Sequence, residues 1–145
     1  MRYVHTNLVA RDWRRLAGFY RDVFDCAVGA ERELAGPWLE RGSGISGARI
    51  EGVHLKLPGY GTEGPTLEIF QYAQPADAES PTPHRLGLGH IAFQVEDVDG
   101  MREKVIAAGG SAVGSIETVT LPGTGVITWT YVRDPEGNII ELQRA

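Results

Sequence analysis

Two histidines and two glutamates recur at matching places in the two halves of the chain. His5 opens the segment His-Thr-Asn-Leu-Val, and His90 opens the segment His-Ile-Ala-Phe-Gln-Val. Later in each half a glutamate stands between two apolar residues, as Glu68 in Leu-Glu-Ile and as Glu141 in Ile-Glu-Leu. Neutral imidazoles and carboxylates form a mixed nitrogen and oxygen donor set, which Zn, Ni, Co, Fe or Mn ions all accept. The four residues are therefore candidate ligands of one divalent metal ion.

Each of these residues also has an ordinary structural interpretation. A single histidine in a strand is more often a packed or surface residue than a ligand, and a single strand glutamate normally faces solvent. The matched placement of all four favours the metal site, because a carboxylate in a largely buried strand is costly unless it is paired or bound to a metal. His54 and His84 have no counterpart in the other half, and we interpret them as surface or supporting residues.

The elements that would position the four residues follow one pattern twice. Asp12 and Asp97 each stand seven residues after a histidine of the set, and aspartate is a favoured helix N-cap. Apolar residues at helical spacing follow both aspartates, and Gly109-Gly110 ends the second helix. Strands are predicted at residues 2–10, 27–34, 48–57 and 65–73 in the first half, and at 88–95, 113–121, 125–133 and 139–143 in the second.

The order strand, helix, strand, strand, strand thus occurs twice, and such a repeat governs the choice of fold. We predict an α+β fold of two tandem βαβββ modules, each a curved mixed sheet with its helix on the outer face. The first module covers residues 1–74, a proline-rich linker 75–87 and the second module 88–145, within one compact domain. Turns at 58–64 and 134–138 precede the last strands. If the modules pair about a pseudo-twofold axis, within one chain or across a dimer, the four candidate ligands meet in a cup.

Several residues around the candidate ligands are weaker candidates for a substrate pocket. Trp38, Phe70 and Trp129 could line the cup and exclude water, although core packing is the favoured interpretation of Trp129. Trp38 belongs to the glycine-rich segment 35–47, which is predicted to be a loop. That loop is interpreted either as a lid over the site or as a surface loop anchored by its tryptophan.

Composition limits the classes of function and location. The formal net charge is −5 and the sequence pI is about 5.3, which argues against nucleic acid or an anionic membrane as the partner. One cysteine, Cys26, excludes an internal disulfide and fits a reducing, cytoplasmic setting. The sequence contains no signal peptide pattern and no apolar run of membrane-spanning length. A small molecule is the expected partner.

The chain resembles the vicinal oxygen chelate superfamily of glyoxalases, bleomycin-resistance proteins and extradiol dioxygenases. The resemblance covers nearly the whole chain and implies paired βαβββ modules that form a cup around one divalent metal ion. It also implies that the metal ligands are His5, Glu68, His90 and Glu141, a set similar to that of bacterial glyoxalase I. The segments that carry it are His5-Thr-Asn-Leu-Val, Gly64-Pro-Thr-Leu-Glu68, Gly89-His90-Ile-Ala and Tyr131-Val-Arg-Asp-Pro-Glu-Gly-Asn-Ile-Ile-Glu141.

The resemblance implies a metal-dependent lyase or isomerase of the glyoxalase I type. Such an enzyme removes a proton next to a carbonyl, and the metal stabilises the resulting enediolate. Glu141 is the first choice for the base, with Glu68 as the alternative or second base. The expected substrate is a hemithioacetal or an acyl thioester, and the expected assembly is a homodimer.

Two other functions stay open on the same resemblance. Methylmalonyl-CoA epimerases are similar but tend to carry Gln where this chain has Glu68. An epimerase would need a second carboxylate base on the preceding strand, where Glu51 is the acidic candidate, although a surface position for Glu51 is favoured. A binding protein that confers drug resistance generally lacks the four ligands.

Three positions differ from the glyoxalase I pattern. The resemblance would place glutathione-binding residues, an Arg, an Asn and an Arg, where this chain has Val9, Tyr72 and Leu86. The metal ligands thus match the family while the thiol carrier is left open.

Overall fold

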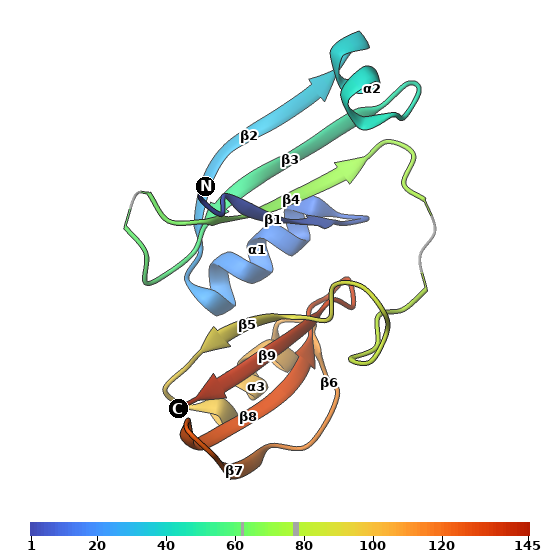
Figure 1. Cartoon of the computed structure of the whole chain (residues 1–145). Helices are drawn as coiled ribbons and strands as arrows, with labels where there is room; N and C mark the ends of the chain where they lie inside the picture. The colour runs from blue at the N-terminus through green and yellow to red at the C-terminus, as the bar shows by residue number, and fades with distance from the viewer. Residues whose placement is uncertain (62, 77–78) are drawn as a thin grey trace. The chain divides into compact units, whose positions relative to one another are not determined.

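The computed structural model describes residues 1–61, 63–76 and 79–145 (Figure 1). The chain divides into two compact units, Met1–Ala78 and Glu79–Ala145, and each unit is built on its own sheet. The predicted turn at 58–64 contains residue 62 and the predicted linker at 75–87 contains residues 77 and 78, which lie outside the described residues. Among the described residues, no helix is long and apolar enough to cross a membrane.

The first unit is a four-stranded sheet in the order β1-β4-β3-β2. The pair β1 and β4 is parallel, whereas the other two pairs are antiparallel. The last strand of the unit therefore lies between the first strand and the third. Its elements are β1 (His5–Val9), α1 (Trp13–Phe24), β2 (Ala27–Ala35), α2 (Pro37–Ser43), β3 (Arg49–Lys56) and β4 (Thr66–Tyr72).

The second unit repeats this plan with one interruption. Its strand order is β5-β9-β8-β6, with β5 and β9 parallel, and β7 also pairs with β8. The two short strands β6 and β7 follow each other along one edge of β8, where the sequence predicted one strand at 113–121. The elements are β5 (Ile91–Gln94), α3 (Val98–Ala107), β6 (Ser111–Ala112), β7 (Glu117–Leu121), β8 (Gly125–Arg133) and β9 (Ile139–Arg144). The predicted α+β fold of two βαβββ modules is confirmed.

Helix α1 begins and ends where its sequence predicts. The side chain of Asp12 accepts a hydrogen bond from the backbone N–H of Arg15 at 3.0 Å, which caps the first turn. Asp25, in the left-handed conformation with φ 55°, ends the helix after Phe24. One side of the helix is buried against the sheet face that carries Leu67 and Ile69. The buried residues of α1 are Trp13, Leu16, Ala17, Phe19, Tyr20, Val23 and Phe24.

Helix α3 has the same kind of start in the second unit. Asp97 accepts from the backbone N–H of Gly100 at 3.1 Å, and Val98 and Val105 are buried against β8 and β9. Gly110 follows the helix at a point where any side chain would collide with the backbone carbonyl of Arg133. Both helices thus cover one face of their own sheet and leave the other face for other contacts.

The predicted loop at 35–47 is wrong, because residues Pro37–Ser43 form helix α2 (Figure 1). Pro37 stands at the first helical position, where its missing N–H is tolerated, and Gly44 ends the helix in the left-handed conformation. Leu39, at 8% exposure, is the residue that anchors this helix, whereas Trp38 is 56% exposed. A tryptophan-anchored loop therefore does not describe the segment.

Leu39 belongs to a cluster on the sheet face opposite α1, together with Ala48, Ile50 and Phe70. Gly52 makes this packing possible, because it pairs with Phe70 across β3 and β4. A Cβ atom at residue 52 would collide with the backbone carbonyl of Ile69 and with the ring of Phe70. The sheet at this point therefore admits only glycine without movement of the backbone.

We expect Gly52→Ala to lower the free energy of unfolding by about 1–3 kcal/mol, because the added methyl group overpacks the sheet. Gly42→Ala is the matched control in the same unit, since Gly42 lies in α2 with open space around its Cα. That control should be neutral or stabilising by up to about 1 kcal/mol. Chemical denaturation of both variants measures the difference, and equal stability of the two would contradict the packing described.

Candidate metal centre

The parallel pairing of β1 with β4 brings His5 and Glu68 together. In this register His5 is opposite Thr66 and Asn7 is opposite Glu68, so all four side chains share one face of the sheet. The Nε2 atom of His5 lies 3.6 Å from Oε2 of Glu68. The side-chain amide of Asn7 donates to the same oxygen at 2.9 Å. This is the face that α1 leaves uncovered.

His54 joins this cluster from the other side of Glu68. It is directly opposite Glu68 in the antiparallel pair β3 and β4, and its Nε2 atom lies 2.7 Å from Oε1 of Glu68. Its other ring nitrogen, Nδ1, lies 3.2 Å from the hydroxyl of Thr66. This contact with a candidate ligand agrees with the supporting role predicted for His54, and the half-buried ring does not fit the surface alternative.

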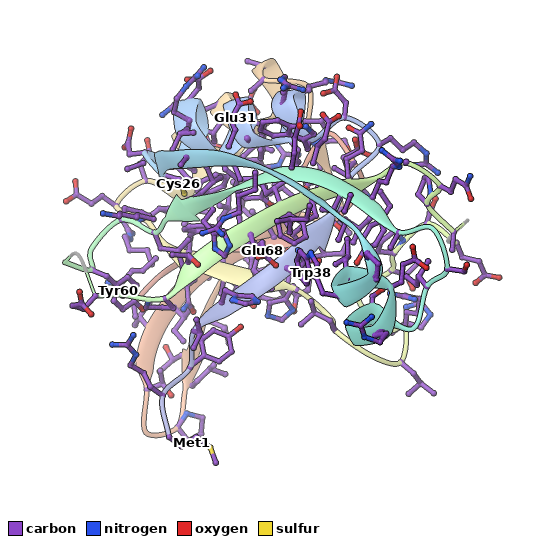
Figure 2. All side chains as sticks on the ribbon, turned by 90° about the horizontal axis from the view of Figure 1, so that it is seen from above. Met1, Cys26, Glu31, Trp38, Tyr60 and Glu68 are labelled. Atoms are coloured by element: carbon purple, nitrogen blue, oxygen red, sulfur yellow. The ribbon has the colours of Figure 1, made fainter. Side chains whose placement is uncertain are left out.

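Burial and neighbouring charges influence the protonation of His54 in this cluster. Glu68 is only 8% exposed, and Figure 2 shows it over the middle of the first sheet. Burial is the largest influence on the pKa of His54 and lowers it from the ordinary value, against the raising effect of the Glu68 carboxylate. The neutral imidazole that results keeps a lone pair for a ligand. Glu68 lies within ion-pair distance of the imidazoles of His5 and His54.

The second unit repeats the histidine and glutamate pair at the equivalent positions. His90 Nε2 lies 3.0 Å from Glu141 Oε2. Glu141 is opposite Ala92 in β5 and opposite Tyr131 in β8, just as Glu68 is opposite Asn7 and His54. Ala92 and Tyr131 thus replace the amide and the imidazole that hold the first carboxylate.

Tyr131 lies beside the pair of His90 and Glu141, and the sequence did not predict it as a site residue. Its ring centroid is 5.0 Å from that of His90 and 5.1 Å from that of Trp129. Burial, and secondarily the charge of Glu141, raise the pKa of Tyr131 above its ordinary value. The phenol is therefore protonated at neutral pH and able to donate a hydrogen bond.

The aromatic pocket candidates have different surroundings. Phe70 lies two residues after Glu68 on the same face, and its ring makes an edge contact with His54 at 6.3 Å between centroids. Trp129 is on the face of Glu141 and is half-buried, so core packing does not describe it. Trp38 is exposed on α2, beside the face that carries Glu68 (Figure 2).

Two other candidates lie apart from these clusters. Glu51 pairs with Gln71 and so faces α1, on the side of the sheet opposite Glu68. Its carboxylate accepts from Trp13 Nε1 at 3.4 Å and lies 3.4 Å from Arg14 Nη1. Glu51 therefore does not share the face of the candidate ligands, and the favoured surface position agrees with these contacts. His84 is an exposed residue of the second unit.

The turn before β9 fixes the register of the strand that carries Glu141. Asp134, at 3% exposure, accepts hydrogen bonds from the backbone N–H groups of Glu136 and Asn138 at 2.9 and 3.0 Å. It also accepts from the side-chain amide of Asn138 at 2.8 Å. Gly137 supplies the left-handed residue of this turn, with φ 91°. The Asp-Pro-Glu-Gly-Asn segment is thus a structural device for starting β9.

Asp134→Ala should lower the free energy of unfolding by about 2–4 kcal/mol, since it removes the buried acceptor of two part-buried backbone N–H groups and one side-chain amide. Asp99→Ala removes an exposed carboxylate from the same unit and is expected to have an effect of under about 1 kcal/mol. Urea denaturation of the two variants gives the comparison. If Asp134→Ala were as stable as Asp99→Ala, the turn would not depend on the aspartate.

The chemistry of the first cluster fits a divalent cation. One ligand atom from each of His5, His54 and Glu68 lies within 4.8 Å of the others. Neutral imidazoles do not balance the negative charge of a buried carboxylate, so a bound cation would stabilise it. The imidazole nitrogens offer lone pairs that can coordinate the same cation. The convergence of both clusters on one ion stays a prediction.

Comparisons with known proteins agree with this architecture. Residues 2–142 match the family model described as the Glyoxalase/Bleomycin resistance protein/Dioxygenase superfamily. A glyoxalase family protein from Bacillus cereus has a similar fold, with a TM-score of 0.84 at 20% identity over 99% of this chain and 93% of that one. No curated protein matches this sequence.

Two further solved structures are similar in fold. A glyoxylase/bleomycin resistance protein/dioxygenase domain from Frankia sp. EAN1pec has a TM-score of 0.65 at 21% identity, over 100% of this chain and 98% of that one. Glyoxalase I from Zea mays has a TM-score of 0.68 at 20% identity, over 99% of this chain but 44% of the maize chain. At these identities the structures establish the fold alone.

Proposed function

The chain belongs to the Glyoxalase/Bleomycin resistance protein/Dioxygenase superfamily, and from this premise we propose that it is a divalent-metal-dependent lyase or isomerase of the glyoxalase I type. The observation that carries the proposal is the recurrence of one histidine and glutamate pair at equivalent positions of the two sheets. His5, Glu68, His90 and Glu141 are the proposed ligands of a single ion. Zn, Ni, Co, Fe and Mn all accept such a donor set.

A bound divalent cation supplies a Lewis acid for negative charge that develops on substrate oxygens. The protein supplies the base, which takes a proton from the carbon next to a carbonyl and returns it to the neighbouring carbon. We assign this role to Glu141, whose contact with His90 engages one oxygen. Both oxygens of Glu68 are engaged, by His54 on one side and by Asn7 and His5 on the other. Glu68 is therefore held more firmly than Glu141, and we keep it as the alternative or second base.

The substrate class we propose is a small hemithioacetal, with an acyl thioester as the alternative. Val9 and Tyr72 occupy positions where glyoxalase I resemblance expects glutathione-binding residues, and both are on the face of Glu68. Neither residue offers the charged or amide group expected for glutathione, which favours a different thiol. An epimerase with a second base on β3 is disfavoured, because Glu51 faces α1. We further propose a cytoplasmic homodimer, for which the single cysteine fits a reducing compartment.

Glu141→Gln should lower kcat by about 10²- to 10⁴-fold in the metal-loaded protein, because the amide cannot take up the proton. The assay offers hemithioacetals of methylglyoxal with several thiols, then acyl-CoA substrates followed by deuterium exchange at the α-carbon. Glu117→Gln is the control, since Glu117 is an exposed glutamate of the same unit. Circular dichroism should show the same fold for both variants.

A non-catalytic binding protein would give the opposite pattern. Such a protein would take up an aromatic or cationic ligand without turnover, and chelators would leave that binding unchanged. If no substrate of the panel turned over with any of the five metals, while binding survived chelation, the enzymatic proposal would be wrong.

A further inference from the structure

The cluster in the first unit contains a second histidine, His54, which has no histidine counterpart in the second unit. His54 comes from β3, the strand on the far side of Glu68 from His5, so the carboxylate lies between two imidazoles. The two rings are perpendicular, with centroids 5.6 Å apart. Strand pairing therefore places one potential histidine ligand on each side of Glu68.

The distances permit all three side chains to reach one ion. Imidazole nitrogen and carboxylate oxygen bind zinc at about 2.0–2.2 Å, so two donors on opposite sides of an ion are about 4.2 Å apart. The ligand atoms of His5, His54 and Glu68 lie within 4.8 Å of one another. Shifts of a few tenths of an ångström in exposed or half-buried side chains would close that difference.

The second nitrogen of His54 has the partner that a metal-bound histidine requires. A ligating histidine almost always donates its other ring N–H to an acceptor, which fixes the tautomer. For His54 that acceptor is the hydroxyl of Thr66, 3.2 Å from Nδ1. The same hydroxyl can donate to Nδ1 instead, because it is both donor and acceptor. Thr66 thus accommodates either tautomer of the ring.

Without a cation, the contact of 2.7 Å between Nε2 and Glu68 requires a proton on Nε2, because two lone pairs would repel each other. With a cation, the proton on Nε2 is replaced and Nδ1 carries the hydrogen towards Thr66. The two states of the site therefore differ in the tautomer of one ring. This difference gives the site a measurable signature besides activity.

We propose that His54 is itself a metal ligand, so that the first unit holds the cation through His5, His54 and Glu68, and that metal uptake switches His54 from the Nε2–H to the Nδ1–H tautomer. The proposal rests on the proposed metal-dependent function and extends it. In the second unit Tyr131 stands at the position equivalent to His54. The inference therefore concerns the first unit, which would bind the ion with three residues.

A competing role for His54 is to orient Glu68 without touching the metal. In that case Nε2–H would keep donating to the carboxylate after the metal is bound. Loss of such a supporting contact typically weakens metal binding by about 10- to 100-fold. Affinity alone therefore separates the two roles poorly, whereas the tautomer of the ring separates them directly.

The test is ¹⁵N NMR of the histidine rings in the full-length protein, with and without zinc, in wild type, His54→Gln and His84→Gln. We expect the Nε2 resonance of His54 to move to the metal-bound position on zinc saturation, while Nδ1 becomes protonated. His54→Gln should lower zinc affinity by more than about 100-fold, measured by chelator competition. His84→Gln, which changes an exposed histidine, should bind zinc like the wild type.

The outcomes distinguish this inference from the function beneath it. If His5 and His90 acquire metal-bound nitrogens while His54 retains Nε2–H, His54 is a positioning residue and the inference is overturned, although the proposed function stands. If the protein binds none of Zn, Ni, Co, Fe or Mn, both are overturned. The wild-type spectra decide the matter even if His54→Gln fails to fold.

Discussion

A buried carboxylate, Glu68, is the group on which the rest of the site depends. Strand pairing fixes it in the middle of a sheet at 8% exposure, and the side chains around it are two imidazoles and an amide. Such a charge is stable in a sheet only when donors or a cation surround it. The parallel pairing of the first and last strands of the unit brings His5 to it across 63 positions of sequence, and α1 covers the opposite face. The fold thus leaves one face of the sheet free for a polar cluster.

Much of this architecture could be predicted from the sequence, because its signals are local. Asp12 and Asp97 cap the expected helices, and both histidines lie beside the expected glutamates. Helix α2 was missed because the glycines around Pro37 suggested a loop, although that proline and a terminal glycine are also helix boundaries. The direct pairing of His54 with Glu68 was not predicted, because His54 has no counterpart in the second half of the sequence. It lies as far before residue 61, the centre of the predicted turn, as Glu68 lies after it, so hairpin pairing could have placed them together.

The two units share a skeleton but surround their carboxylates differently. Asn7 and His54 engage Glu68, whereas Ala92 and Tyr131 stand at the corresponding positions around Glu141. The duplicated fold therefore places a histidine and a glutamate at matching positions in both units, whereas the residues next to each glutamate differ. In our account the first unit serves mainly to hold a cation, and the less restrained carboxylate of the second moves the proton. Strand register, which put Glu51 on the opposite face, decides which residues take part.

The proposed function depends on one cation being bound by the imidazole and carboxylate pairs of both units. Anomalous diffraction at the zinc edge, from crystals grown with zinc, tests it most directly. We predict a single strong peak per chain, within bonding distance of His5, Glu68, His90 and Glu141. Separate peaks at the two pairs, or a bound zinc that touches none of these four side chains, would contradict the account.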